Sequence, residues 1–400
     1  MIAFLKVSII FGLIVSAIFN KVPLAWALLG GSIILGVSFG IPFIEILKTA
    51  LNSTIAWNTI NIVLILYLIA VLENILRNKN FLKNMVTSLK NLVKNPKINL
   101  MSMPIIMGLL PSVGGALFSA PLLEEMSEGN DISAEKKAFI NYWFRHVWEP
   151  FLPLYPGIIL VSSLSDFKIP ILVRETFIFG IIVFVIGFIL AFYKLQLTKE
   201  EIHECDCKKE FINFLINFSP FIFILLLVLA FHIDLLHVLL ITIIALFLIF
   251  RYSLDEIKNT LKDALKIENL ILIVSVMIFK GMLEKANAIS DISYFLSSMN
   301  IPLSIIFFTL PFIVGLLTGV TQASIGITFP ILLSLMPYGQ TLKWVVFSFI
   351  SGYTGVMMSP THLCLIFTKE YFKTDWNKLY PEVIKAGVIL IIFNFLKTIF

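Results

Sequence analysis

The sequence predicts an all-α polytopic membrane protein made of two inverted repeats, each with five transmembrane helices, a re-entrant hairpin and a discontinuous helix. The first observation is composition: 58% of the 400 residues are hydrophobic and 14% are charged, and the mean hydropathy is +0.96. Soluble domains are closer to about half apolar and a quarter charged. The second observation is a series of long uncharged runs, and the third is a pair of similar broken stretches in the two halves. Polar stretches of roughly 15–20 residues are too short to form a separate soluble domain.

The spanning helices follow from apolar runs that approach the ~20 residues needed to cross a bilayer. Two of these runs contain internal proline and polar residues, which predicts that the helix is interrupted there. The predicted spans lie at about 2–19, 22–40, 59–77, 137–165 (interrupted), 172–193, 211–231, 233–250, 268–285, 341–368 (interrupted) and 381–399.

Two further apolar stretches are broken near the centre by Gly, Ser, Thr or Pro. "MPIIMGLLPSVGGA" from Met103 resembles "LPFIVGLLTGVTQA" from Leu310, with the matching Pro and Gly residues 207 positions apart. This similarity predicts an ancient duplication. The predicted repeats cover residues 1–193 and 211–400 with a cytoplasmic linker at 194–210, the hairpins fall at about 98–123 and 301–337, and the interrupted helices fall at about 137–165 and 341–368.

A re-entrant hairpin does not cross the membrane, so each repeat has five crossings and the second repeat must be inverted. With both hairpins treated in this way, 20 of the 30 lysines and arginines fall on one side, seven on the other and three within spans. Positive residues concentrate on the cytoplasmic side of a membrane protein. The sequence therefore predicts a multi-pass protein of the cell (plasma or inner) membrane, with both termini extracytoplasmic.

The hairpin tips are the first candidate binding elements. Bare backbone groups are tolerated at membrane depth only where they are buried in protein or line a wet cavity. Helix N-termini at such tips suit an anion, and the exposed carbonyls of broken helices suit Na⁺ or a proton-carrying water. The predicted substrate cradle consists of Ser112, Gly114, Gly115, Thr321, Gln322 and Ser324.

The interrupted helices supply ionisable and hydroxyl groups. In "NYWFRHVWEPFLPLYP", Arg145 and Glu149 are four residues apart, so they share a helix face and can pair. One alternative is a buried ion pair that only fixes the break. The other makes Arg145 a forked ligand for a carboxylate or oxyanion, with His146 or Glu149 carrying a coupling proton. At the matching break, Thr354, Ser359 and Thr361 offer only hydroxyls and carbonyls, which fit a cation or a polar solute.

Other charged or metal-binding residue types have simpler interpretations. Glu73 and Arg77, and likewise Lys280 and Glu284, are four residues apart and are predicted to form structural pairs. In "HECDCKK", two cysteines two residues apart with a nearby histidine could bind a soft metal, but a reduced, solvated loop is the simpler interpretation.

These motifs resemble a known group of carriers. Two inverted five-helix repeats with hairpins and broken helices are similar to the ion transporter superfamily, which includes sodium-coupled dicarboxylate and citrate carriers, gluconate permeases and arsenite permeases. "GLLPSVGGALFSAPLLEE" and "NYWFRHVWEPFLPLYPG" look more closely like an integral-membrane family known as a domain of unknown function. The resemblance implies a homodimer and an elevator-like movement. The dicarboxylate carriers place Ser-Asn-Thr at each hairpin tip, but Ser112-Val113-Gly114 and Thr321-Gln322-Ala323 lack the Asn.

Together these patterns predict a secondary active transporter, and not an enzyme, for a small anionic solute such as a carboxylate, sugar acid or oxyanion. We expect coupling to Na⁺ or H⁺ and no cofactor beyond Na⁺. No G-x-x-x-x-G-K-[ST] loop occurs, and the basic residues lie in short loops beside apolar runs, so neither an ATP-binding domain nor nucleic-acid binding is predicted. A channel of the same architecture and a non-transporting membrane subunit are the alternatives. An intramembrane protease would need a Ser-His pair, paired aspartates or an H-E-x-x-H motif, and the sequence shows none of these patterns.

Overall fold

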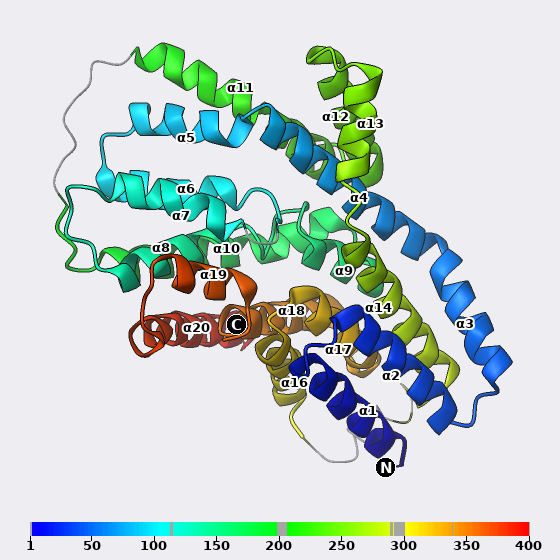
Figure 1. Ribbon diagram of the computed structural model, residues 1–400. Helices are drawn as coiled ribbons and strands as arrows, with labels where there is room; N and C mark the ends of the chain where they lie inside the picture. Colours follow the sequence, from blue (N-terminus) through cyan, green and yellow to red (C-terminus); the bar gives the residue numbers. More distant parts are fainter. Residues whose placement is uncertain are drawn as a thin grey trace.

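The structure is a computed structural model that describes residues 2–112, 115–197, 206–288, 291, 301–337 and 339–399. Within these ranges the chain forms helices and connecting turns, with no β-strand. The all-α polytopic membrane fold predicted from the sequence is confirmed (Figure 1).

The first half of the chain contains ten helices within the described residues. Two of them, α3 and α5, occupy segments that the apolar pattern left as loops, because they carry polar residues along one face. The helices are α1 Ile2–Phe19, α2 Leu24–Ser38, α3 Phe43–Ile55, α4 Trp57–Asn78, α5 Phe81–Leu92, α6 Pro96–Met107, α7 Ala116–Met126, α8 Ala134–Arg145, α9 Pro156–Ser165 and α10 Ile169–Phe192.

The described part of the second half has a similar order of elements. Another short polar helix, α13, was not predicted; its first turn is closed by a capping box between Ser253 and Glu256. The elements are α11 Cys207–Leu225, the π-helical turn η1 Leu226–Ala230, α12 Leu235–Ile249, α13 Leu254–Asp263, α14 Ile267–Lys285, α16 Leu303–Thr318, α17 Thr321–Leu335, α18 Thr341–Met357, α19 Leu363–Tyr371 and α20 Trp376–Ile399.

Five of the described segments are long and apolar enough to cross a membrane. They are α1, α4, α10, α20 and the continuous segment Cys207–Ala230 formed by α11 and η1. Other predicted spans correspond to shorter apolar helices such as α2 and α12. The chain is therefore a multi-pass membrane protein that combines long apolar helices with shorter ones.

The four segments predicted to be broken are each divided into two helices. The first hairpin breaks between α6 and α7, and the second breaks at Gly319 and Val320 between α16 and α17. Gly319 has a φ of +64°, the left-handed conformation that favours glycine at a helix end. The interrupted helices break between Arg145 and Pro156 and between Met357 and Leu363. None of the four runs straight through.

Helix contacts occur in matching pairs in the two halves. Helix α6 packs on α8 as α16 packs on α18, and each pair of hairpin helices lies side by side (Figure 1). The second hairpin helix of one half contacts the end of the interrupted helix of the other, so α7 packs on α19 and α17 on α9. The matching helices of the two halves have labels that differ by ten, as α6 and α16 do. This pairing supports the predicted duplication, which stays a prediction.

Both predicted charge pairs are present. Arg77 Nη2 lies 2.6 Å from Glu73 Oε1, and Lys280 Nζ lies 3.8 Å from Glu284 Oε1. Glu73 is buried, and Lys266 Nζ at the start of α14 lies 4.0 Å from its second oxygen. Two cations therefore offset the charge of this buried carboxylate, as a structural role requires.

Candidate functional site

The candidate site lies where the two interrupted helices meet. The Tyr142 hydroxyl donates to the carbonyl oxygen of Met357 over 2.8 Å, and the Tyr353 hydroxyl donates to that of His146 over 3.0 Å. Both accepting carbonyls lie at helix C-terminal ends, where the α-helical ladder stops, and that of His146 also accepts from the backbone N–H of Glu149 over 3.2 Å. The two buried tyrosines therefore hold the broken ends of α8 and α18 against each other.

The hairpin tips are bonded to these same breaks. The Tyr155 hydroxyl donates to the carbonyl oxygen of Gly108 at the end of α6 over 2.6 Å. In the second half, His362 Nδ1 donates to the carbonyl oxygen of Gly319 at the end of α16 over 2.8 Å. All four breaks are thus connected by direct hydrogen bonds into one buried region.

Arg145 brings a buried positive charge to the first hairpin tip. The residue is 3% exposed, and its Nη2 lies 2.6 Å from the carbonyl oxygen of Ser112 and 3.2 Å from its hydroxyl. Among the described residues, Nε and Nη1 of Arg145 have no hydrogen-bond partner. A buried guanidinium with unpaired donors is costly, and an anion supplies the acceptors it lacks.

Two glycines make room for this arginine. A Cβ at Gly115 would lie 2.2 Å from Arg145 Nη2, and a Cβ at Gly108 would lie 2.1 Å from the Arg145 carbonyl oxygen. Neither glycine has a positive φ, so space and not backbone conformation requires them. The Gly-rich tip therefore allows the arginine to approach the hairpin backbone closely.

The expected pairing of Arg145 with Glu149 is wrong. Because α8 ends at Arg145, the two residues do not share a helix face. Glu149 instead accepts a hydrogen bond of 2.5 Å from the Thr321 hydroxyl at the start of α17. The carboxylate and the guanidinium are therefore held by different hairpins, Glu149 by the second and Arg145 by the first.

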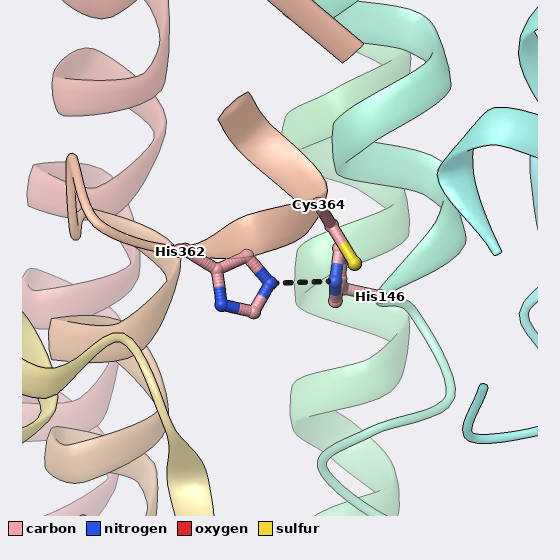
Figure 2. Close-up of side chains that lie close together, drawn as sticks. All are labelled: His146, His362 and Cys364. Carbon is pink, nitrogen blue, oxygen red and sulfur yellow. Dashed lines mark hydrogen bonds between the residues drawn. The ribbon is translucent and has the colours of Figure 1, made fainter. Parts of the chain in front are cut away.

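His146 lies next to two residues that sequence reasoning missed. His146 Nε2 is 3.1 Å from His362 Nε2, and the side chain of Cys364 completes a group whose ligand atoms lie within 4.8 Å of one another. Figure 2 shows the three side chains turned toward one another from the end of α8 and the start of α19. The prediction that the second break offers only hydroxyls and carbonyls is therefore wrong. The signal was present in "SPTHLC", where His and Cys follow the same proline.

The remaining predicted residues have varied positions. Thr321 contacts Glu149, and Ser112 contacts Arg145. The Ser324 hydroxyl instead donates to the Pro311 carbonyl within its own hairpin. The Thr354 hydroxyl donates to the Ile350 carbonyl within α18. Ser359 and Thr361 bond each other over 2.8 Å at the second break. Gly114 lies outside the described residues.

Two small cavities reach the hairpin tips. A cavity of about 90 Å³ is lined by Pro111, Pro156 and Gln322, together with Glu73 and Lys266. Gln322 therefore faces space between the two halves rather than the protein interior. A second cavity, of about 130 Å³, includes Ser112, Gly115, Arg77 and Lys83 in its lining. The first tip is thus next to a cavity whose charged lining is basic.

Solved structures of transporters share this fold. The YdaH transporter of Alcanivorax borkumensis has a TM-score of 0.61 at 11% identity, over 88% of this chain and 87% of that chain. MtrF of Neisseria gonorrhoeae, described as illuminating a class of antimetabolite efflux pumps, has a TM-score of 0.57 at 12% identity, over 89% and 83%. At such low identity the similarity shows the fold alone.

The sequence comparisons give a family. No curated protein sequence is significantly similar to the chain. A family model described as "Protein of unknown function (DUF401)" matches residues 4–399, which confirms the resemblance to a family of this kind noted in the sequence. Nearly the whole chain is matched, including the four breaks and every residue of the candidate site, and the protein belongs to the DUF401 family.

Proposed function

We propose that this protein is a secondary active transporter for a small anionic solute, such as a carboxylate, a sugar acid or an oxyanion. Two transporters of known structure share its fold. The single observation that carries the choice of an anion is Arg145, which is buried and retains two unpaired donors among the described residues. A guanidinium with free donors matches the planar, forked geometry of a carboxylate or oxyanion.

The proposed solute site lies beside the first hairpin tip. Ser112 fixes one edge of the guanidinium through Nη2, so Nε and Nη1 are left for the solute. Glu149 is held away from Arg145 by Thr321, which prevents the carboxylate from neutralising the charge that attracts the solute. Ser112, Gly115, Thr321 and Gln322 remain the proposed cradle residues, and Gln322 lines the cavity between the halves.

Coupling to Na⁺ or H⁺ is part of the proposal. Glu149, a buried carboxyl group at the first break, and the hydroxyls of Ser359 and Thr361 at the second break are the proposed ligands of the coupling ion. The crossed contacts, α7 with α19 and α17 with α9, join the hairpins and the interrupted helices into one unit. We propose that this unit moves as one rigid body in an elevator-type cycle. We also propose that the protein is a homodimer and that it belongs to the ion transporter superfamily.

A thermal-shift screen followed by flux measurements tests the function. Purified protein is heated with carboxylates, sugar acids and oxyanions, each with and without Na⁺, because a ligand that binds the folded state stabilises it by mass action. Compounds that stabilise are then measured for uptake into proteoliposomes under a Na⁺ or a pH gradient. A transporter saturates and shows counterflow, whereas a channel of the same fold shows neither.

Arginine variants make the test specific. Arg145→Ala is expected to abolish the solute-dependent shift and uptake, since one hydrogen bond to a charged group is worth about 1.5–3 kcal/mol, or roughly 10- to 150-fold in affinity. Arg174→Ala is the matched control, because Arg174 is 76% exposed at the start of α10. Unchanged uptake by the Arg145 variant would remove Arg145 from the site.

A further inference from the structure

The side chains of His146, His362 and Cys364 form a compact group with two nitrogen ligands and one sulfur ligand. His146 and Cys364 are buried, and His362 is partly buried. The three ligand atoms lie within 4.8 Å of one another (Figure 2). The Tyr142 ring lies against both imidazoles, with centroids 4.9 Å from His146 and 5.7 Å from His362. The group is thus shielded on one side and held in place by packing.

The hydrogen bonds of the two histidines fix where their protons lie. His146 Nδ1 is 2.7 Å from the carbonyl oxygen of Tyr142, and His362 Nδ1 is 2.8 Å from that of Gly319. A carbonyl oxygen can only accept a hydrogen bond, so both Nδ1 atoms carry a hydrogen. In a neutral imidazole, Nε2 then has a bare lone pair.

The two Nε2 atoms nevertheless face each other at 3.1 Å. Two bare lone pairs at this distance repel, so a positive species must be shared between the rings. A backbone carbonyl on Nδ1 with a free Nε2 is also the arrangement that orients histidine ligands toward a metal. The sulfur of Cys364, which is a preferred ligand of Zn²⁺, lies within 4.8 Å of a ring nitrogen of each histidine.

We propose that His146, His362 and Cys364 bind a Zn²⁺-class metal ion that joins the ends of the two interrupted helices. Two nitrogens bound to one tetrahedral ion at about 2.0–2.1 Å stand about 3.3 Å apart, so the histidines need to separate by only a few tenths of an ångström. Cys364 loses its thiol proton to water and binds as a thiolate, and its sulfur needs to approach by up to about 1.3 Å. The three side chains leave the fourth position of the ion open to water or a small ligand.

The metal site goes beyond the proposed transport function and does not depend on it. It adds a direct link between α8 and α19, beside the tyrosine hydrogen bonds between α8 and α18. A bound Zn²⁺ and one thiolate together contribute one net positive charge next to Arg145. The ion would therefore strengthen an anion site rather than oppose it.

Metal binding is tested directly on purified full-length protein stripped with a chelator. Zn²⁺ is added and bound metal is counted per chain, and Co²⁺ is added to a second sample for absorption spectroscopy. We expect one ion per chain, a thiolate-to-cobalt charge-transfer band, and the intense visible bands of tetrahedral Co²⁺. Cys364→Ser should remove the charge-transfer band, and His362→Ala should weaken binding by more than about tenfold.

Two variants separate this site from others in the chain. Cys207→Ser and His237→Ala remove an exposed thiol and an exposed imidazole, and both should leave metal binding unchanged. If either control removes the ion, or if Cys364→Ser and His362→Ala bind as wild type does, the ion lies elsewhere and the proposal is wrong. Wild-type protein that takes up no Zn²⁺ and gives no tetrahedral Co²⁺ spectrum would also overturn it, leaving a shared proton between the histidines. Neither result bears on whether Arg145 binds a solute.

Discussion

At the scale of single residues, Gly115 and Arg145 depend on each other. The backbone of Gly115 has helical angles that any residue adopts, yet a Cβ there would lie 2.2 Å from Nη2 and 2.5 Å from Cζ of Arg145. The guanidinium cannot simply swing away, because it is buried and bonded to Ser112. The glycine therefore determines where the positive charge lies.

Gly115→Ala should lower the thermal stability of the purified protein, because overpacking at a buried contact costs about 1–3 kcal/mol. The double variant Gly115→Ala/Arg145→Ala removes the guanidinium that the new methyl group meets and leaves its contact with the Ser112 hydroxyl. Its destabilisation should be smaller than the sum of the two single effects, as measured by a double-mutant cycle. Gly12→Ala is the control, since a Cβ at Gly12 meets nothing within 4 Å. Additive effects would show that the two residues do not contact each other.

The sequence identified candidate residues better than it identified their partners. Arg145, Glu149 and Thr321 do lie at the breaks, because charge and hydroxyl groups in an apolar chain are conspicuous. The Thr354 hydroxyl donates to the carbonyl oxygen four residues earlier in its own helix. The sequence alone does not distinguish such a hydroxyl from one that faces a ligand. His362 was overlooked because its partner, His146, is 216 residues away in the chain.

At the scale of elements, the two interrupted helices are held together by a reciprocal pair of tyrosines. Tyr142 of α8 bonds the end of α18, and Tyr353 of α18 bonds the end of α8. The donors are 211 residues apart, and so are the acceptors, Met357 and His146. This symmetry supports the predicted duplication, with an offset of 211 residues at the interrupted helices against 207 at the hairpins.

Tyr142→Phe should destabilise the protein by about 1–3 kcal/mol, because it removes the side-chain donor of the buried Met357 carbonyl while keeping the ring. Tyr353→Phe should cost less, because the His146 carbonyl still accepts from the backbone N–H of Glu149. The measurement is the apparent melting temperature of the purified variants. Tyr193→Phe serves as the control, since Tyr193 is 69% exposed. Destabilisation of the Tyr353→Phe variant that equals or exceeds that of Tyr142→Phe would contradict this prediction.

The short helix α13 is expected to have a first turn whose stability depends on pH. The Ser253 backbone N–H donates to the Glu256 carboxylate over 2.7 Å, and this bond, followed by the one from the Ser253 hydroxyl, lowers the pKa of Glu256. A lowered pKa in the folded state means that the carboxylate stabilises the turn above its unfolded pKa, about 4.3. The contribution is lost as pH falls through the lower folded value.

Hydrogen exchange of the α13 amides tests this effect. Protection, corrected for intrinsic exchange, should fall with acidification in the wild-type protein. Glu256→Gln keeps the capping geometry without the charge, so its protection should be independent of pH over the same range. Equal acid sensitivity in both proteins would assign the effect to another group.

At the scale of the whole molecule, the distribution of positive charge predicts how the protein lies in the membrane. The first repeat ends, and the second begins, at a linker predicted to be cytoplasmic, and Cys207 there is exposed. Lys378 is predicted on the same side and Lys168 on the opposite side, and both side chains are exposed. These positions make the predicted topology testable.

In a Cys205→Ser/Cys207→Ser background, Lys168→Cys should react with a membrane-impermeant maleimide in intact cells. Lys378→Cys should react only after the membrane is opened, because the reagent cannot reach the cytoplasm. The native Cys205 and Cys207 of the wild-type protein, both in the linker predicted to be cytoplasmic, give an independent reading and should behave like Lys378→Cys. Reversed labelling would place the termini in the cytoplasm, and labelling of both positions in intact cells would contradict the crossing number.

Composition and hydrophobic pattern alone determined that this is a polytopic helical membrane protein, and Gly and Pro placed the four helix breaks. Both are local properties: a run of apolar side chains decides what solvent a segment enters, and a missing N–H or Cβ decides where its helix stops. Only the tertiary structure decided that Arg145 and Glu149 are separated, and that His146 meets His362 and Cys364. Those outcomes depend on how segments some 200 residues apart pack, and periodicity within one helix carries no information about a partner in another.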